Sequence, residues 1–458
     1  MISYSAMYRF NRPFIYFICM VSAMGGLLFG YDWVVIGGAK IFYEEFFSLT
    51  GKNLLIGLAT SIALAGCMLG ALTAGSLADR YGRKPLLILA AFIFVASSIG
   101  TGAFNGFGVF LTARFIGGIA IGIASCLSPM YIAEVAPANI RGKLVTLNQL
   151  TIVIGILAAQ IVNWRIAGTH DTAWNIDLGW RWMFWATAFP ALAFLILAFF
   201  IPESPRWQLI SGNIDSARQT LTRIGGSDYA SDESRTVLAA AESDIQKGGL
   251  KLLLSKPFKK VLLLGIIIAF FQQWCGTNVI FNYAQEIFQS AGYDVDNTFI
   301  NIVITGIANL IFTFVALFTV EKLGRRALML LGAGGLAGIY FILGTCYFFQ
   351  VKGICMVILC VLAIACYAMT LGPITWVLIS EIFPNKVRAV AVATTTFFLW
   401  IGSFTLTLSF PLLNGSLGTS GTFWIYTAIC AAAFIYLRKA LPETKGKSLE
   451  QLENDLIR

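Results

Sequence analysis

The sequence predicts an all-α membrane protein with twelve transmembrane helices, arranged as two six-helix halves with short cytoplasmic helices between them. Composition, charge-free runs and an internal repeat each indicate this fold class. Of the 458 residues, 58% are hydrophobic and only 12% are charged, whereas an ordinary soluble domain is about 25% charged. So few charges would not cover the surface of a soluble protein of this length.

Long charge-free runs locate most of the spans, because a bilayer core of about 30 Å is crossed by about 20 helical residues. Eight runs are long enough for one span each: Leu54–Ala78, Leu86–Ala113, Leu144–Trp164, Trp182–Pro202, Val261–Gln285, Asn297–Val320, Ala327–Val351 and Gly353–Ser380. The run Ala389–Leu437 is long enough for two. We expect Pro411, Asn414 and Gly415 to break it.

Two further apolar segments each contain one charge. Phe14–Gly37 contains Asp32, and Phe107–Ala133 contains Arg114. These two segments bring the expected total to twelve spans. The first exceeds a signal-peptide core of about 7–15 residues, so we interpret it as a retained span.

The net charge of +9 is explained by topology rather than by a nucleic-acid partner, which we do not expect. With a cytoplasmic N-terminus and alternating spans, 26 of the 32 Lys and Arg residues fall on the cytoplasmic side. Arg114 lies within a span, and the outside holds only Lys40, Lys52, Arg165, Arg181 and Lys352. This is the positive-inside bias. It predicts a multi-pass protein of the cytoplasmic membrane with both termini in the cytoplasm.

The chain divides into four parts. We expect a six-helix half at 1–202, cytoplasmic amphipathic helices at 203–260, a second six-helix half at 261–441 and a cytoplasmic tail at 442–458. The halves repeat each other at offsets of 242, 247 and 240 residues, in three pairs of segments: Asp79–Lys84 with Glu321–Arg326, Glu134–Arg141 with Glu381–Arg388, and Pro202–Glu203 with Pro442–Glu443. Two similar halves of this kind can rock against each other about a central site.

The motifs resemble those of the sugar porter family of the major facilitator superfamily. The resemblance runs in the family's order over nearly the whole chain, through Gly75–Lys84, Glu134–Gly142, the PESPR run at Pro202–Arg206, Gln272–Asn278, Gly372–Trp376 and the PETKG run at Pro442–Gly446. It implies a major facilitator fold and sugar transport.

Asp32 and Arg114 are charges inside spans, where a lone charge costs about 2.5–3.5 kcal/mol on insertion scales. Their predicted depths allow them to meet. They would form either a permanent structural ion pair or a proton switch, in which ionised Asp32 pairs with Arg114 and protonated Asp32 releases it. The resemblance implies the switch, because both positions match the proton-coupling pair of bacterial symporters in the family.

Uncharged amides form the second group of polar residues within the spans. Hydrocarbon supplies no partners for them, so they bond between helices or bind a ligand such as a sugar, whose hydroxyls both donate and accept. The resemblance implies sugar contacts from Gln149, Gln272, Gln273, Asn278, Asn309 and Trp376, with Phe29 and Trp400 beside the pocket. On a regular helix Gln272 and Asn278 would point about 120° apart, so we expect a helix break near Gly276.

Three positions depart from the family's pattern. Ile156 stands where a pocket Gln is common, Leu399 stands where Gln or Asn is common, and Asn282 replaces a frequent Tyr. The pocket is therefore less polar on two sides, and the sequence does not select one sugar.

Charged residues at the cytoplasmic ends form the third group. They either anchor topology as solvated loop charges or, as the resemblance implies, form a gate network that holds the inner ends together. Its members are Asp79, Arg83, Glu134, Arg141, Glu203, Arg206, Glu321, Arg325, Glu381, Arg388 and Glu443.

Together these features predict a secondary active transporter that couples entry of a monosaccharide, pentose or hexose, to a proton by alternating access. A facilitative sugar uniporter is the alternative, and a transporter-like sugar sensor is a weaker one. We expect no enzymatic activity, no metal or other cofactor, and function as a monomer in the lipid bilayer. A primary pump is disfavoured because no GxxxxGK[ST] loop occurs.

Overall fold

The structure is a computed structural model that describes residues 8–243, 250–384 and 387–444. Within these ranges the secondary structure is helical, with no strand. The predicted all-α class is confirmed. Of the predicted tail at 442–458, residues 445–458 lie outside the described ranges.

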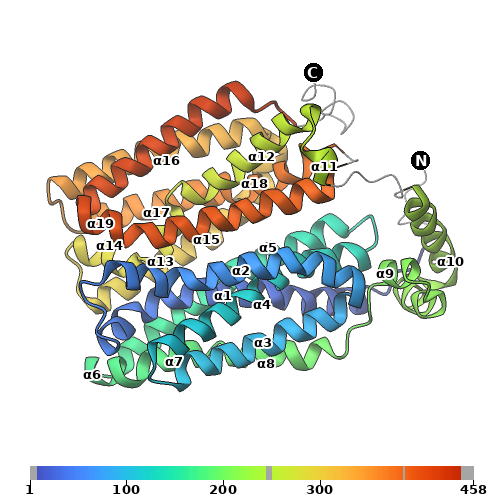
Figure 1. Cartoon of the computed structure of the whole chain (residues 1–458), viewed down its shortest axis with the longest axis horizontal. Helices are drawn as coiled ribbons and strands as arrows, with labels where there is room; N and C mark the ends of the chain where they lie inside the picture. The colour runs from blue at the N-terminus through green and yellow to red at the C-terminus, as the bar shows by residue number, and fades with distance from the viewer. Residues whose placement is uncertain (1–7, 244–249, 385–386, 445–458) are drawn as a thin grey trace.

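The first group of helices runs from α1 to α8 (Figure 1). Their bounds are α1 Arg12–Phe46, α2 Asn53–Tyr81, α3 Arg83–Ala103, α4 Phe107–Val135, α5 Arg141–Thr169, α6 Thr172–Trp174, the π-helical turn η2 Asn175–Gly179, α7 Trp180–Trp185 and α8 Ala188–Ala198. Three shorter elements follow, α9 Pro205–Ile210, α10 Ile214–Ser243 and α11 Leu250–Leu253. They occupy the stretch for which short amphipathic helices are predicted.

The second group contains interrupted helices. Its elements are α12 Lys256–Trp274, α13 Thr277–Asn282, α14 Ala284–Ser290, α15 Val295–Leu323, α16 Arg325–Phe348, α17 Ile354–Met369, α18 Leu371–Glu381 and α19 Arg388–Ala440. Inside α19 the backbone turns at Gly418, with φ 68° and ψ 174°. The expected break at Pro411, Asn414 and Gly415 is therefore wrong. Gly418 makes the turn because its positive φ suits glycine, while a membrane helix tolerates Pro411 in its interior.

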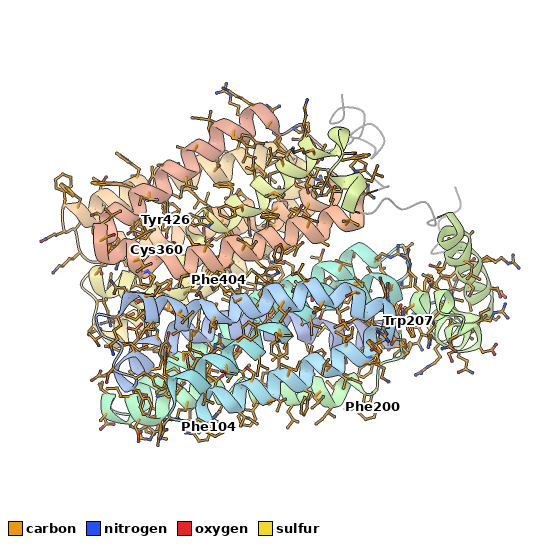
Figure 2. All side chains as sticks on the ribbon, viewed as in Figure 1. Phe104, Phe200, Trp207, Cys360, Phe404 and Tyr426 are labelled. Atoms are coloured by element: carbon orange, nitrogen blue, oxygen red, sulfur yellow. The ribbon has the colours of Figure 1, made fainter. Side chains whose placement is uncertain are left out.

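The described residues contain 11 helices long and apolar enough to cross a membrane. The last of them, Val390–Ala440, includes the turn at Gly418 and so consists of two lengths of helix. Large apolar side chains cover the outside of the bundle. Phe104 and Phe200, for example, project from its lower edge in Figure 2 and are 56% and 69% exposed. Such an exterior suits lipid rather than water.

Glycines bring the helices of the first group into close contact. A Cβ added to Gly118 of α4 would lie 1.9 Å from the carbonyl oxygen of Ala63 in α2. A Cβ on Gly30 of α1 would lie 1.9 Å from the carbonyl oxygen of Ile152 in α5. Small residues at such crossings let backbones pack directly, which is how membrane helices associate tightly.

We call the end of the bundle beside α9–α11 the linker end and the opposite end, beside α6 and α14, the far end. The ribbons of the two groups approach each other at the far end and spread apart toward the linker end (Figure 1). Contacts between the groups at the far end include stacked rings of Phe42 and Phe299, 6.3 Å between centroids. The side chain of Gln285 also accepts from the backbone N–H of Ile41 and donates to the carbonyl of Gly38.

Candidate functional site

A buried ion pair joins α1 and α4. Arg114 Nη1 donates to Asp32 Oδ1 at 2.7 Å, and Nη2 donates to the backbone carbonyl of Asp32 at 3.3 Å. The two residues are 2% and 4% exposed, and the guanidinium lies over the ring of Phe184, 5.1 Å from its centroid. A buried charge is tolerable only when paired, so removing either residue would leave an uncompensated buried charge.

Three of the predicted sugar-contacting amides form a hydrogen-bonded chain. Asn278 Nδ2 donates to Gln273 Oε1, Gln273 Nε2 donates to Gln272 Oε1 at 2.6 Å, and Gln272 Nε2 donates to the hydroxyl of Tyr367. We call Asn278, Gln273, Gln272 and Tyr367 the amide chain. All three amides are buried. Because each group both donates and accepts, the amide chain can exchange internal bonds for bonds to a ligand's hydroxyls.

The amide chain exists because the helix is interrupted at Gly276. This residue has φ +89° and separates α12 from α13, which confirms the expected break. A Cβ at Gly276 would lie 2.9 Å from the ring of Tyr426, so both the backbone angle and the space require glycine. The break turns Asn278 back toward Gln273.

The other predicted sugar-contacting residues lie outside the amide chain. Asn309 is buried on α15, Gln149 is half-buried on α5, and Trp376 is 39% exposed on α18. Among the described residues no hydrogen bond connects Gln149 or Asn309 to the amide chain. Of the positions that depart from the family's pattern, Leu399 is buried and Ile156 is half-buried.

Aromatic rings from both groups of helices meet in one cluster. Phe29 and Trp33 on α1 contact Trp400 on α19, at centroid distances of 5.8 and 5.9 Å, and each other at 5.7 Å. Trp400 is 1% exposed, and its indole nitrogen has no hydrogen-bond partner among the described residues. Sequence reasoning placed Phe29 and Trp400 together but missed Trp33.

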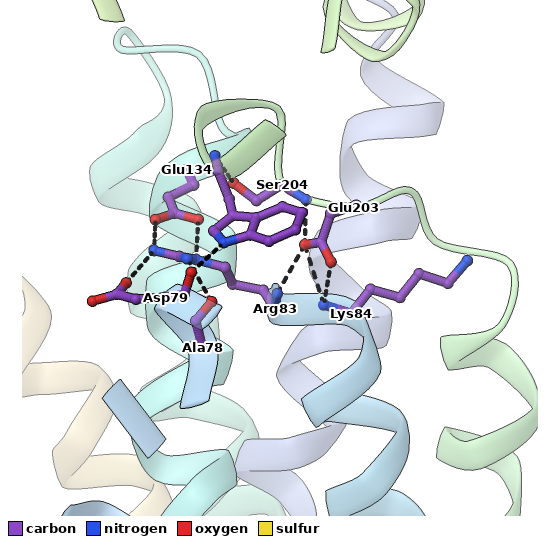
Figure 3. A network of polar contacts seen from close by, with 8 residues as sticks. Ala78, Asp79, Arg83, Lys84, Glu134, Glu203 and Ser204 are labelled. Carbon is purple, nitrogen blue, oxygen red and sulfur yellow. Dashed lines mark hydrogen bonds and ion pairs between the residues drawn. The ribbon is translucent and has the colours of Figure 1, made fainter. Parts of the chain in front are cut away.

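At the linker end, Arg83 is the centre of a polar network (Figure 3). Its guanidinium donates to both oxygens of Glu134 at 2.9 Å, pairs with Asp79 at 3.5 Å and donates to the carbonyl of Ala78. Such a fork-shaped contact is stronger than a single ion pair. The network fastens the end of α2 to α3 and α4.

Glu203 joins this network by accepting hydrogen bonds from backbone N–H groups. Its carboxylate accepts from the N–H groups of Arg83 at 2.9 Å, of Lys84 at 3.2 Å and of Ser204 at 2.7 Å (Figure 3). Burial raises the pKa of Glu203 above its ordinary value, although these N–H groups and the Arg83 charge act in the opposite direction. The carboxylate therefore caps the start of α3, where helix N–H groups lack partners.

The second group of helices repeats the arrangement. Arg325 pairs with Glu381 at 3.1 Å, and Glu443 accepts from the backbone N–H of Arg325 at 2.9 Å and of Arg326 at 3.1 Å. Thr444 donates to the second oxygen of Glu381 at 2.7 Å. The side chain of Glu321, the remaining predicted member here, lies outside the described part of the structure.

Two of the remaining gate residues, Arg141 and Arg388, make matching contacts in the two groups of helices. Arg141 donates to the carbonyl of Ala136, and Arg388 donates to that of Phe383. Arg206 lines a cavity of about 180 Å³ together with Glu134 and Arg141. The ion pairs described at the linker end each lie within one group of helices, so they stiffen the ends of the two groups separately.

A buried lysine at the far end was not predicted as part of a site. Lys40, 3% exposed, pairs with Glu44 on its own helix at 2.6 Å and with Glu286 on α14. From the sequence, Lys40 is expected only as a cation on the outside. The four-residue spacing of Lys40 and Glu44 is a signal in the sequence for their pair. The pair with Glu286 has no such signal, because Glu286 lies 246 residues away.

The chain is similar to known sugar transporters along nearly its whole length. The family model described as "Sugar (and other) transporter" matches residues 18–456. The D-xylose-proton symporter of Escherichia coli (strain K12) is 36% identical, with 97% of this chain and 96% of that protein covered. The arabinose-proton symporter of Bacillus subtilis (strain 168) is also 36% identical, with 97% and 95% covered.

Solved structures show the same fold. The inward-open conformation of the xylose transporter XylE from E. coli superimposes with a TM-score of 0.86 at 36% identity, over 96% of this chain and 100% of that one. The XylE structure bound to 6-bromo-6-deoxy-D-glucose gives 0.82 at 37% identity, over 98% and 100%. The helices described here thus form a major facilitator fold, and the chain belongs to the sugar transporter family.

Proposed function

We propose that this protein is a proton-coupled monosaccharide symporter that works by alternating access in the cytoplasmic membrane. Solute and proton cross together, and no covalent bond is made or broken. The observation that carries the proposal is the buried Asp32–Arg114 pair, because a uniporter has no need of an ionisable acid buried between its helices. Relatives named as D-xylose-proton and arabinose-proton symporters support coupling to a proton.

The sugar site we propose lies at the amide chain, with Asn309, Gln149 and Trp376 as further contacts. Uncharged amides suit a neutral polyol because each supplies both a donor and an acceptor. Tyr367 supplies a hydroxyl at the end of the chain. A pentose or a hexose carries hydroxyls that suit these amides. The apolar side chains of Leu399 and Ile156 offer no hydrogen bonds, so fewer hydroxyls of the sugar can be bound.

The described contacts support an inward-facing state, with the linker end toward the cytoplasm. The two halves, 1–202 and 261–441, contact each other at the far end through Gln285 and through the Lys40–Glu286 pair. The linker-end networks would act as the inner gate when the halves approach each other there. We propose that both termini are cytoplasmic and that one chain suffices for transport.

The test is uptake of labelled D-xylose and L-arabinose into proteoliposomes, with and without an imposed pH gradient. A proton moving down about 100 mV supplies about 2.3 kcal/mol, enough for roughly fifty-fold accumulation. Asp32→Asn should abolish accumulation while leaving downhill exchange. Asp171→Asn is the matched control, because Asp171 is exposed and caps α6, a role that Asn also fills. Accumulation by Asp32→Asn would show that the proton-switch role of Asp32 is wrong, whereas a wild-type protein that never accumulates sugar would favour a uniporter.

A further inference from the structure

A small cavity lies between the buried ion pair and the second half of the molecule. Its volume is about 10 Å³, and Asp32, Arg114, Thr60 and Asn282 are among its lining residues. A cavity of this size accommodates about one water molecule. Asn282 comes from α13, whereas the other three residues come from α1, α4 and α2.

Three buried polar atoms around the cavity have no partner among the described residues. They are Asp32 Oδ2, Arg114 Nε and the Asn282 side-chain oxygen. The three residues are only 4%, 2% and 3% exposed, so bulk water does not satisfy these atoms. Buried polar groups left without a hydrogen-bond partner destabilise the folded state. Two acceptors and one N–H donor are the set that a single water satisfies, because water donates twice and accepts twice.

We propose that this cavity is a water site through which Asn282 links the protonation of Asp32 to α13. This deepens the proposed function and rests on it. With Asp32 ionised, the water accepts from Arg114 Nε and donates to both Asp32 Oδ2 and the Asn282 oxygen. When Oδ2 is protonated, it becomes a donor to the water. The water can then no longer donate to Oδ2, and one of its two hydrogens loses its acceptor.

Asn282 transmits this change because of its place on α13. Asn278, the first donor of the amide chain, lies four residues earlier and therefore on the same helix face. The backbone of α13 is in direct contact with α1, since a Cβ at Gly37 would lie 2.6 Å from the carbonyl oxygen of Phe281. A six-residue helix thus carries an amide of the sugar site at one end and the water-facing Asn282 at the other.

Asn282→Leu tests the proposal, because leucine is similar in size but holds no water. With a gradient of one pH unit, coupling of one proton permits about tenfold accumulation of D-xylose. We expect the variant to accumulate at least fivefold less, while exchange of D-xylose at equal pH stays within twofold of wild type. Asn282→Ser, which keeps a polar group and room for water, should restore accumulation to within threefold.

Asn163→Leu is the matched control, because Asn163 is a buried amide on α5 that bonds to the carbonyl of Val35 instead. It should leave the ratio of accumulation to exchange unchanged. The proposal is wrong if Asn282→Leu accumulates normally or loses exchange in equal measure. It is also wrong if Asn163→Leu shows the same selective loss, or if Asn282→Ser behaves like Asn282→Leu.

A second measurement separates this proposal from the proposed function. A high-resolution experimental structure should show water density within hydrogen-bonding distance of Asp32 Oδ2, Arg114 Nε and Asn282, and none in Asn282→Leu. If wild type fails to accumulate sugar, symport is refuted, and the density alone decides the water site. A cavity without density in wild type would overturn the site even where symport holds.

Discussion

Neutralising Glu286 should loosen the far end of the molecule, whereas neutralising Glu44 should not. Both carboxylates pair with the buried Lys40, but Glu44 belongs to the same helix and Glu286 to the other half. Only the Glu286 pair must therefore break when the halves separate at the far end. Glu286→Gln and Glu44→Gln are isosteric changes that differ in this one respect.

The size of the effect follows from burial. A hydrogen bond to a charged group contributes about 1.5–3 kcal/mol net. The Glu286 side chain is 30% exposed, while Lys40 is 3% exposed, so solvent reduces the contribution to about 1–2 kcal/mol. This corresponds to an opening equilibrium about 5–30 times larger in Glu286→Gln.

Amide hydrogen exchange of the full-length protein measures that equilibrium, because exchange of transiently opened segments tracks the open population. Peptides from α14, residues 284–290, should exchange about 5–30 times faster in Glu286→Gln, and peptides around Arg83 should not change. Glu44→Gln should match wild type in α14. Equal acceleration in both variants, or none in Glu286→Gln, would refute the argument that Lys40 bridges the halves.

Three further predictions concern the amide chain and its surroundings. Gln273→Leu leaves partners in the amide chain unpaired, which costs about 1–3 kcal/mol. The Kd for D-xylose should therefore rise about 5–150-fold, and an unchanged Kd in a binding assay would contradict the proposed sugar site. Gly276→Ala places a Cβ against Tyr426 at a positive φ, so the melting temperature should fall, and unchanged melting would disprove the requirement for glycine. Burial raises the pKa of Glu203, so the contribution of this shift to stability is present at low pH and is lost as pH rises through the elevated pKa. The melting temperature of Glu203→Gln should lack this pH dependence, and identical pH profiles of variant and wild type would contradict the role of Glu203.

The fold could be predicted from the sequence because its main signals are local. Charge-free length determines most spans, and the glycine at 276 marks the break that brings Asn278 to Gln273. The error in placing the turn inside α19 has the same origin. Proline and asparagine are typical turn residues, yet the backbone reverses a few residues later at Gly418, where the positive φ falls.

The unpredicted parts of the candidate site depend on contacts between distant segments. Tyr367 lies within a charge-free span, and its hydroxyl becomes the end of the amide chain only because the fold brings it within hydrogen-bonding distance of Gln272. Lys40 was interpreted as a sign of topology, since nothing near it in the sequence shows its burial. Asn282 was noted as a departure from the family's pattern, whereas its position opposite Asp32 arises from the contact of α13 with α1.

Close glycine contacts join continuous helices in the first half. Several helices of the second half are instead interrupted. Helices α1, α2, α4 and α5 are continuous and in backbone contact, whereas α12–α14 and α17–α18 are interrupted at Gly276, Tyr283 and Thr370. Short segments can pivot about such interruptions without moving the whole half. Occlusion of a bound solute would then be a local step of the second half, separable in time from the larger rotation that exchanges access between the two sides.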